Sequence, residues 1–406
     1  MSRFDPRVLA NDPVRRTEVV GWLERGLLAV DPERLTREAL DDSNQQRPAV
    51  IIAIGKAAPA MARGAAECLE VIGGVCVSDH SEAVPPMIRA MAGNHPLPGA
   101  ASFEAGKAVV DCVVNAPADA RLLALVSGGG SAVCESPRPG ISADYLSMAT
   151  GALLKGGASI GALNLVRRHL SSIKCGGLAR AAGRPIETLV LSDVAGADPA
   201  IVASGPTIPT ASDPAGAREV LVRHHIEVPD SVWEAMNRDA GPLELPTVTL
   251  LGDGRTAAQA VGEIQSGPYM VMPGWLDGDI DTCLDHFLAG AGPGVTIAAG
   301  EPVVEVNGSG TGGRNTHAAL LAARRLVGTN TLFTAFATDG VDGLSGTAGA
   351  IVDGRTIERG GDPARALADF DSANYLATTG DLLICPPTGT NVADLWILRR
   401  QTPPAT

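Results

Sequence analysis

Most strand-like apolar runs in this chain end on glycine together with a polar or charged residue. The runs are IIAIGK, LLALVSGGGS, LVLSDVAG, TLLGDG and FTAFATDGVDG. Helix-like segments separate them, and this alternation is typical of a parallel α/β sheet. In such sheets ligands bind beyond the carboxyl ends of the strands, where backbone N–H groups and helix N-termini are available. The pattern therefore predicts an enzyme that acts on a small anion.

Hydrophobic periodicity places the individual elements. Helices are expected at 16–30, 33–41, 56–72 and 102–115, with two more between about 142 and 182. Strands are expected at 48–54, 73–79, 121–126, 187–192, 247–252, 268–272, 295–299, 303–306, 332–337 and 382–385. The proline-rich stretch 83–99 predicts a shaped loop, because proline fixes φ and restricts its predecessor.

The length of 406 residues favours two domains. A stretch rich in proline and polar residues, about 205–246, contains two short helix-like segments. We place the boundary there, so that residues 1–240 form an N-terminal domain and residues 241–406 a C-terminal domain.

Composition excludes several classes of protein. The net charge of −13 argues against nucleic acid, which needs a basic face. The chain lacks a signal-like N-terminus and any apolar run long enough for a transmembrane helix, so we expect a cytoplasmic protein without a membrane partner. The seven cysteines form no C-x-x-C pair, and we expect all of them to be small buried residues in a reducing compartment.

The segment NGSGTGGRN matches the dinucleotide-binding pattern G-x-G-x-x-G at residues 308–313, between an expected strand and a helical run. A nicotinamide site would also need an acidic residue at the end of the next strand, and Asp339 is there. However, Arg314 and Asn315 occupy the start of the helix, and Asp339 belongs to a second glycine-rich loop. These features disfavour the nicotinamide interpretation.

The same features also suit phosphoryl transfer, which depends on positioning and charge neutralisation. The loop SGGGS could form an anion-binding nest, and Lys56 could hold a phosphate or carboxylate. Carboxylates at strand ends could bind Mg²⁺ or accept a proton; they are Asp193, Glu301, Asp339 and Asp342. The competing structural interpretations are a plain turn, a surface lysine and helix caps. Neither the G-x-x-x-x-G-K-[ST] phosphate loop nor G-x-S-x-G occurs in the sequence.

Eight blocks spread along the chain resemble the glycerate 2-kinase family. In order they are GKAAPAM, GNHPLPG, LVSGGGSA, LNLVRRHLSSIKCGGLA, LSDVAGADPAIVASGPT, GEPVVEVNGSGTGGRN, FATDGVDG and GDLLICPPTGTNVADL. The resemblance implies two α/β domains, a Rossmann-like parallel sheet followed by a mixed-sheet domain, with the active site in the cleft between them. It also implies ATP- and Mg²⁺-dependent phosphorylation of D-glycerate at its 2-hydroxyl to 2-phosphoglycerate.

The resemblance also implies which residues act. The catalytic set is Lys56, Asp193, Glu301 and Arg314. As carboxylates at strand ends, Asp193 and Glu301 are also the candidate metal ligands, and the sequence does not decide which of them binds metal and which handles the proton. From the glycine-rich loops and strand ends themselves, we expect the substrate or nucleotide to contact Ser127, Gly128, Gly129, Gly130, Ser131, Gly310, Gly312, Gly313, Asn315, Asp339 and Asp342. The alternatives are a kinase for another small hydroxy or sugar acid, a nicotinamide-dependent hydroxypyruvate reductase, and a non-catalytic anion-binding protein. A homodimer is left open.

Overall fold

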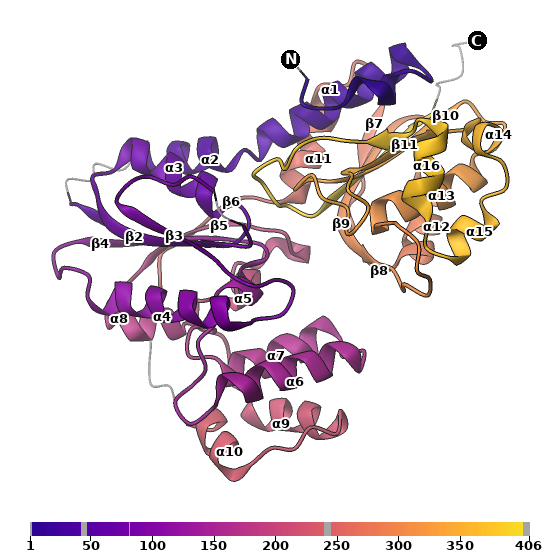
Figure 1. The fold of residues 1–406 in the computed structure, drawn as a ribbon. Coiled ribbons are helices and arrows are strands. Elements are labelled where there is room, and N and C mark those ends of the chain that lie inside the picture. Colours follow the sequence, from indigo (N-terminus) through magenta and orange to yellow (C-terminus); the bar gives the residue numbers. More distant parts are fainter. Residues whose placement is uncertain (1, 42–46, 81, 239–244, 401–406) are drawn as a thin grey trace. The chain divides into compact units, whose positions relative to one another are not determined.

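The computed structural model describes residues 2–41, 47–80, 82–238 and 245–400. The chain divides into two compact units (Figure 1). The parallel-sheet unit comprises Pro32–Ser192 and Asp198–Leu251, and the mixed-sheet unit comprises Met1–Asp31, Asp193–Ala197 and Gly252–Thr406. Two α/β units were predicted, and this prediction is confirmed.

The parallel-sheet unit contains a six-stranded sheet in the order β3-β2-β1-β4-β5-β6. This is the order of a doubly wound Rossmann fold. The strands are β1 (Ala49–Ile54), β2 (Val71–Ser78), β3 (Ile88–Ala92), β4 (Arg121–Ser127), β5 (Glu187–Leu191) and β6 (Val248–Gly252). Every residue of β1 is buried, as expected of a central parallel strand whose two faces are both covered.

Helices flank this sheet, and some of them build a core of their own. They are α2 (Pro32–Asp41), α3 (Ala58–Cys68), α4 (Ala100–Val114), α5 (Gly130–Val133), α6 (Ala143–Lys155), α7 (Ile160–Leu170), α8 (Gly177–Ala182), α9 (Pro214–Arg223) and α10 (Asp230–Met236). Side chains of α6, α7, α9 and α10, including Leu146, Val166, Leu221 and Val232, form a separate hydrophobic cluster. In Figure 1 these helices lie below the sheet as a distinct layer.

The mixed-sheet unit contains a seven-stranded sheet in the order β12-β11-β10-β13-β9-β7, with β8 also paired to β9. The strands are β7 (Tyr269–Val271), β8 (Leu276–Asp279), β9 (Gly294–Val303), β10 (Thr331–Ala337), β11 (Gly349–Asp353), β12 (Leu382–Leu383) and β13 (Asp394–Arg400). Antiparallel pairs join β13 to both β9 and β10, whereas β7 and β8 run parallel to β9.

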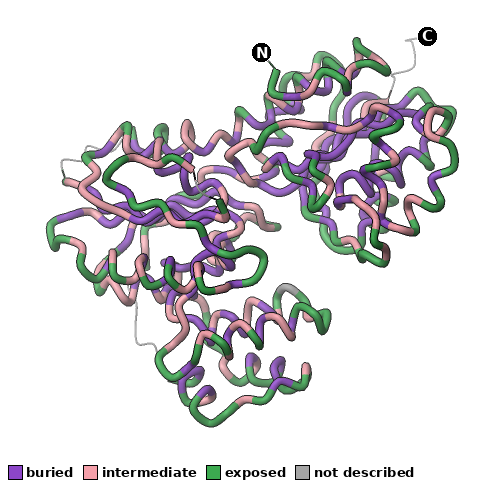
Figure 2. The backbone as a smooth tube through the Cα atoms, in the orientation of Figure 1, coloured by how far each residue is buried: buried purple, intermediate pink, exposed green. Residues whose placement is uncertain are grey.

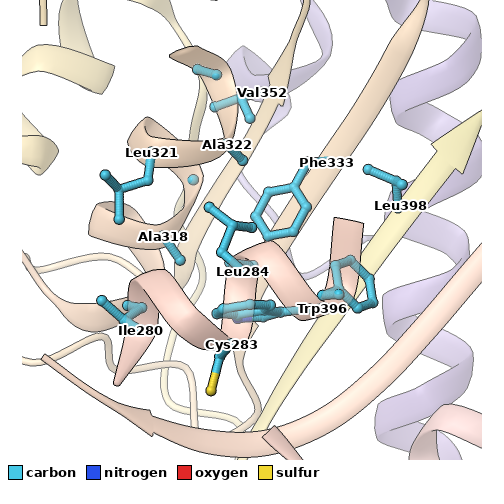
Figure 3. Close-up of a cluster of buried hydrophobic side chains, with 14 of the residues drawn as sticks. Ile280, Cys283, Leu284, Ala318, Leu321, Ala322, Phe333, Val352, Trp396 and Leu398 are labelled. Atoms are coloured by element: carbon cyan, nitrogen blue, oxygen red, sulfur yellow. The ribbon is translucent and has the colours of Figure 1, made fainter. Parts of the chain in front are cut away.

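The core of the mixed-sheet unit lies between its sheet and the helices α12 (Ile280–Gly290) and α13 (Arg314–Arg325). Phe287, Phe333 and Trp396 meet edge to face there, with ring centroids 5.5 to 5.9 Å apart. Figure 3 shows Phe333 and Trp396 with Leu284 between helix and sheet. Figure 2 shows buried residues running through the strands of both units. The remaining helices are α1 (Pro13–Ala29), α11 (Gly254–Glu263), α14 (Thr356–Gly360), α15 (Ala364–Ala368) and α16 (Ser372–Thr379).

The structure corrects several of the predicted elements. The stretch 83–99 contains the strand β3, three helices rather than two lie between 142 and 182, and one strand, β9, replaces the predicted pair at 295–299 and 303–306. The strands β8, β11 and β13 were not predicted. Within the described residues no helix is both long and apolar enough to cross a membrane.

The prediction that all seven cysteines are buried is wrong for four of them. Cys76, Cys134 and Cys283 are buried, and burial raises the pKa of Cys76 and Cys134 to about 12. The other four are partly exposed, namely Cys68, Cys112, Cys175 and Cys385.

The boundary predicted between residues 240 and 241 lies outside the described residues. The compact units nevertheless divide the chain differently, since β6 neighbours β5 in the parallel sheet and residues up to Asp31 belong to the mixed-sheet unit. An ion pair of Arg16 on α1 explains why the N-terminal residues belong to the mixed-sheet unit. The fully buried guanidinium lies 2.9 Å from Asp353 Oδ2 and 2.5 Å from Asp381 Oδ1.

Replacing Arg16 with methionine should therefore destabilise the mixed-sheet unit. Asp353 and Asp381 would lose a fully buried partner but keep Arg359, so we expect the free energy of unfolding to fall by about 1.5–3 kcal/mol, as for the loss of a hydrogen bond to a charged group. Denaturant unfolding followed by circular dichroism measures the change. Arg7→Met is the matched control, because Arg7 is exposed and, within the described part of the chain, its ion-pair partner is the neighbouring Asp5. An Arg16 variant as stable as the Arg7 variant would contradict this role.

Candidate active site

In the parallel-sheet unit, the turn after β1 and the loop after β4 are packed against each other. The Lys56 N–H donates to Gly128 O at 2.9 Å, and the Ala57 N–H donates to Ser127 Oγ at 3.0 Å. Gly55 has φ +123°, and a Cβ there would lie 2.4 Å from Ser127 O. Because β1 and β4 are neighbours, this contact places Lys56 beside the SGGGS loop.

The glycines of the SGGGS loop are required by close packing. Gly129 is left-handed with φ +79°, and a Cβ on it would lie 3.0 Å from Lys56 Cγ. A Cβ on Gly130 would lie 2.6 Å from Ala203 Cβ. The loop is therefore confined on one side by Lys56 and on the other by the segment around Ala203.

A buried ion pair between Lys174 and Glu135 holds this loop at Ser131. Lys174 Nζ donates to Ser131 O at 3.0 Å and forms an ion pair with Glu135, and both side chains are almost fully buried. Burial lowers the pKa of Lys174, whereas the charge of Glu135 raises it. Ser131 Oγ also lies 2.8 Å from Ser204 Oγ. Lys174 and Glu135 were not among the predicted site residues; the SSIKCGG block contained the lysine, but no local pattern pairs it with Glu135.

Asp79 is a further carboxylate near Lys56 that the sequence prediction missed. It follows β2 directly, and its Oδ1 lies 2.6 Å from His80 Nδ1. Burial raises the pKa of Asp79, but the hydrogen bond from His80 and the charge of Lys56 outweigh that effect and lower it. Its position after VCVS is the same strand-end signal that identified the predicted carboxylates.

In the mixed-sheet unit, Arg314 is held by two carboxylates. Its Nε lies 2.6 Å from Asp394 Oδ2, its Nη2 lies 3.2 Å from Asp394 Oδ1, and its Nη1 lies 2.7 Å from Glu301 Oε1. Residue 394 lies opposite Gly300 in the antiparallel pair of β13 and β9, which brings the two carboxylates together. Arg314 and Glu301 were predicted site residues, whereas Asp394 was missed together with its strand.

The charges of this group are strongly coupled. Burial lowers the pKa of Arg314, but the charges of Asp394 and Glu301 outweigh burial and raise that pKa above its ordinary value. Burial raises the pKa of Asp394 to about 6, against the opposing charge of Arg314. The guanidinium therefore stays protonated. A guanidinium has about five N–H donors. The described contacts use only part of that set, so donors remain for a ligand.

Asp342 has a different environment from the other predicted carboxylates. It is 1% exposed, and its two oxygens accept the Asn315 and Thr316 N–H groups, each at 2.8 Å. Burial raises the pKa of Asp342, although those N–H groups lower it. Asn315 is also fully buried. The observed role of Asp342 is to cap α13, and the ligand contact predicted for Asp342 and Asn315 stays a prediction.

The NGSGTGGRN loop is already engaged by two aspartates. The Ser309 N–H donates to Asp369 Oδ1 at 3.1 Å, and the Thr311 N–H donates to Asp371 Oδ1 at 2.8 Å. The Gly310 N–H donates to Asp369 O at 2.8 Å. The loop also does not follow a strand directly, because β9 ends at Val303. An anion could reach these three N–H groups only by displacing the aspartate segment.

The remaining predicted carboxylates also lie in the mixed-sheet unit. Asn391 Nδ2 donates to Asp193 Oδ2 at 3.3 Å, and Asp339 Oδ1 accepts the Val341 N–H at 2.9 Å. Among the described residues, no group of three or more His, Cys, Asp or Glu side chains is arranged to hold a metal. Of the predicted site residues, the structure thus brings Lys56 to the SGGGS loop, Glu301 to Arg314, and Asp342 to Asn315.

A cavity of about 530 Å³ lies away from these groups. Its walls include Gly294, Asn330 and Arg400. Gly294 and Arg400 pair at one end of β9 and β13, whereas Glu301 and Asp394 lie at the other end of these two strands. This cavity is therefore not the candidate site.

Comparison with known families matches both units. Residues 18–237 match a family described as a domain of unknown function, DUF4147, and residues 294–394 match the MOFRL family. The chain is 36% identical to the D-glycerate 2-kinase of Thermotoga maritima, over 97% of this chain and 99% of that protein. It is 32% identical to a protein of Agrobacterium vitis whose name proposes a hydroxypyruvate reductase, over 96% of this chain and 95% of that protein.

Solved structures show the same architecture. The fold is similar to a crystal structure of glycerate kinase from Thermotoga maritima, with a TM-score of 0.85 and 33% identity, covering 96% of this chain and 100% of that chain. It is also similar to the structure of a protein from Pyrococcus horikoshii, with a TM-score of 0.78 and 30% identity, over 96% and 99% of the two chains.

The cap formed by Asp342 gives a direct test of its structural role. Asp342→Asn replaces one of the two accepting oxygens by an NH₂ group that faces a backbone N–H, and we expect it to lower the free energy of unfolding by about 1–3 kcal/mol. Thermal or denaturant unfolding measures the change. Asp339→Asn is the comparison, because Asp339 lies in the same loop and is partly exposed. Equal stability of the two variants would argue against the cap.

Proposed function

The chain belongs to the glycerate 2-kinase family, and from this premise we propose that it transfers the γ-phosphoryl group of ATP to the 2-hydroxyl of D-glycerate. The products would be 2-phosphoglycerate and ADP. The observation that carries the proposal is the contact between the Lys56 turn and the SGGGS loop, at the carboxyl ends of two neighbouring parallel strands. This is where open α/β sheets bind ligands.

Lys56 and the SGGGS loop would bind phosphate. Phosphoryl transfer needs little covalent chemistry from the protein, and catalysis consists of positioning and of neutralising charge on the transferred group. The Lys56 ammonium supplies a positive charge, and the backbone of the loop supplies N–H groups. The buried pair of Lys174 and Glu135 fixes the loop at Ser131, so its donors need not reorganise when the phosphate arrives.

Arg314 would bind the carboxylate of the acid. Asp394 and Glu301 fix the plane of the guanidinium, and its remaining N–H groups can accept a planar carboxylate. The 2-hydroxyl lies next to that carboxylate in glycerate. A cation that holds the carboxylate therefore favours phosphorylation at the 2-position over the 3-position. On this view Glu301 orients Arg314, and it is a positioning residue.

Asp193 fits the role of a magnesium ligand. Mg²⁺ bound to a nucleotide usually takes one or two carboxylates together with phosphate oxygens and water, so a site with many protein ligands is not required. When bound, the ion would neutralise charge on the phosphate oxygens. Asn391 orients the Asp193 carboxylate through its amide. We assign Asp339 the remaining role, acceptance of the hydroxyl proton.

Dehydrogenase activity is not favoured by the NGSGTGGRN loop. A dinucleotide pyrophosphate binds at the N-terminus of the helix that follows such a loop. In this chain Asp342 accepts the N–H groups at the start of α13, and Asp369 and Asp371 accept those of the loop. A pyrophosphate would have to replace these carboxylates.

The function is tested by the position of the product phosphate. Incubation with ATP, Mg²⁺ and D-glycerate should give a product that enolase alone converts, because enolase accepts the 2-phosphate. A signal that requires added phosphoglycerate mutase would mean phosphorylation at the 3-hydroxyl and would contradict the proposal. Oxidation of NADH with hydroxypyruvate, in place of ATP-dependent turnover, would support the reductase.

Lys56→Met should lower kcat by about 10²- to 10³-fold, because one group that stabilises developing charge is lost. Steady-state kinetics with ATP and D-glycerate measure the effect, and circular dichroism checks the fold. Lys107→Met removes the same charge from an exposed position on α4 and should leave the rate unchanged. A Lys56 variant within a few-fold of the Lys107 variant would refute the assignment.

A further inference from the structure

A small pocket in the parallel-sheet unit is lined by several basic side chains and by no acidic side chain among the described residues. It has a volume of about 150 Å³, and its walls include Arg138, Arg180, Arg238 and Lys174. If each water takes about 30 Å³ of liquid volume, the pocket has space for a few waters or one tetrahedral oxyanion.

Arg138 lines the pocket, and its guanidinium donates hydrogen bonds to backbone carbonyl groups. Its Nε donates to Ser171 O at 3.2 Å, and its Nη1 donates to Met236 O at 3.3 Å. Carbonyl oxygens satisfy the N–H groups but do not neutralise the charge. Burial lowers the pKa of Arg138, and the nearby charges of Arg180 and Arg238 lower it as well.

Arg180 and Arg238 complete the cationic wall. Arg180 Nη1 donates to Cys175 O at 2.7 Å, while its Nε is buried without a hydrogen-bond partner. Arg238 Nη1 donates to Pro139 O at 3.4 Å. No ion pair joins any of the three arginines to a carboxylate among the described residues. This contrasts with Lys174 in the same pocket, whose charge is balanced by Glu135.

Crowded guanidinium groups without a counter-charge repel one another, and a bound dianion would remove that repulsion. Guanidinium groups bind phosphate oxygens through short, charge-assisted hydrogen bonds. We propose that this pocket binds a small oxyanion, namely phosphate or a phosphate monoester, between Arg138, Arg180 and Arg238. Ser172 lies on the same wall, with its Oγ donating to Ser136 O at 3.0 Å.

The pocket is separate from the Lys56 turn but shares Lys174 with the SGGGS loop. The Lys174 ammonium contacts Ser131 O of the loop, while the side chain also lines the pocket. An anion bound here would therefore act on the loop through Lys174. The proposal does not depend on the proposed kinase activity, because binding is measured without nucleotide and without D-glycerate.

The test is a titration of the full-length protein with inorganic phosphate at constant ionic strength, followed by ³¹P NMR or calorimetry. We expect saturable binding, weakened at least about tenfold by Arg180→Gln and by Arg238→Gln, since each variant loses one charge-assisted contact. Arg223→Gln is the matched control. It removes an exposed arginine of the same unit, on α9, that pairs with Glu219 outside the pocket. Circular dichroism checks the fold of each variant. If the Arg180 variant does not fold, the Arg238 variant is sufficient for the test, because Arg238 is exposed.

Three results would overturn the proposal. They are the absence of saturable phosphate binding, equal weakening by the Arg223 variant, and loss of binding in Lys56→Met with full binding in both pocket variants. The last result would place the phosphate at the SGGGS loop instead.

A parallel titration with 2-phosphoglycerate separates the two sources of the oxyanion. Tighter, arginine-dependent binding of the ester supports a phosphate monoester as ligand, and tighter binding of inorganic phosphate supports the free anion.

Discussion

Backbone segments in this protein approach one another more closely than any side chain would allow, and the candidate site depends on that contact. Gly55 faces Ser127 O, and Gly313 faces Asp342, at distances where a Cβ would lie 2.4 and 2.1 Å away, respectively. Any other residue at these positions would separate the loops by several tenths of an ångström. At Gly55 this shift would move the Lys56 turn away from the SGGGS loop, and at Gly313 it would move the start of α13 away from Asp342.

Ion pairs in which at least one partner is buried hold neighbouring elements together. Lys174 and Glu135 hold the SGGGS loop, Arg314 and Asp394 join α13 to β13, and Arg16 ties α1 to the carboxylates of the mixed-sheet unit. Buried pairs contribute little net stability but enforce one geometry, because separating the partners leaves a charge without solvent. The arginines of the small pocket depart from this arrangement, and that departure motivates the oxyanion proposal.

The sequence predicted the strands that carry local signals and missed those defined by distant partners. Runs such as IIAIG and LLALVS are buried on both faces, so hydrophobicity alone reveals them. In contrast, β13 lies near the C-terminus and becomes a central strand only by pairing with both β9 and β10. Asp394 was missed for the same reason. Lys56 was predicted because it follows a strand that ends on glycine, and Arg314 because it follows the glycine-rich NGSGTGG segment. The partners of Lys174, in contrast, come from another part of the chain.

The NGSGTGGRN loop shows why a sequence motif identifies a site only when its donors are accessible. Its glycines match the dinucleotide pattern, but they are required here because Asp369 and Asp371 pack against Gly308 and Gly310, and Asp342 packs against Gly313. Asp342 occupies the anion position at the start of α13 with a carboxylate of the protein itself. The Asp342 carboxylate therefore supplies the negative charge at the N-terminus of α13. The positive charge that we propose for substrate binding is that of Arg314, whose side chain leaves the same helix and whose donors Asp394 and Glu301 use only in part.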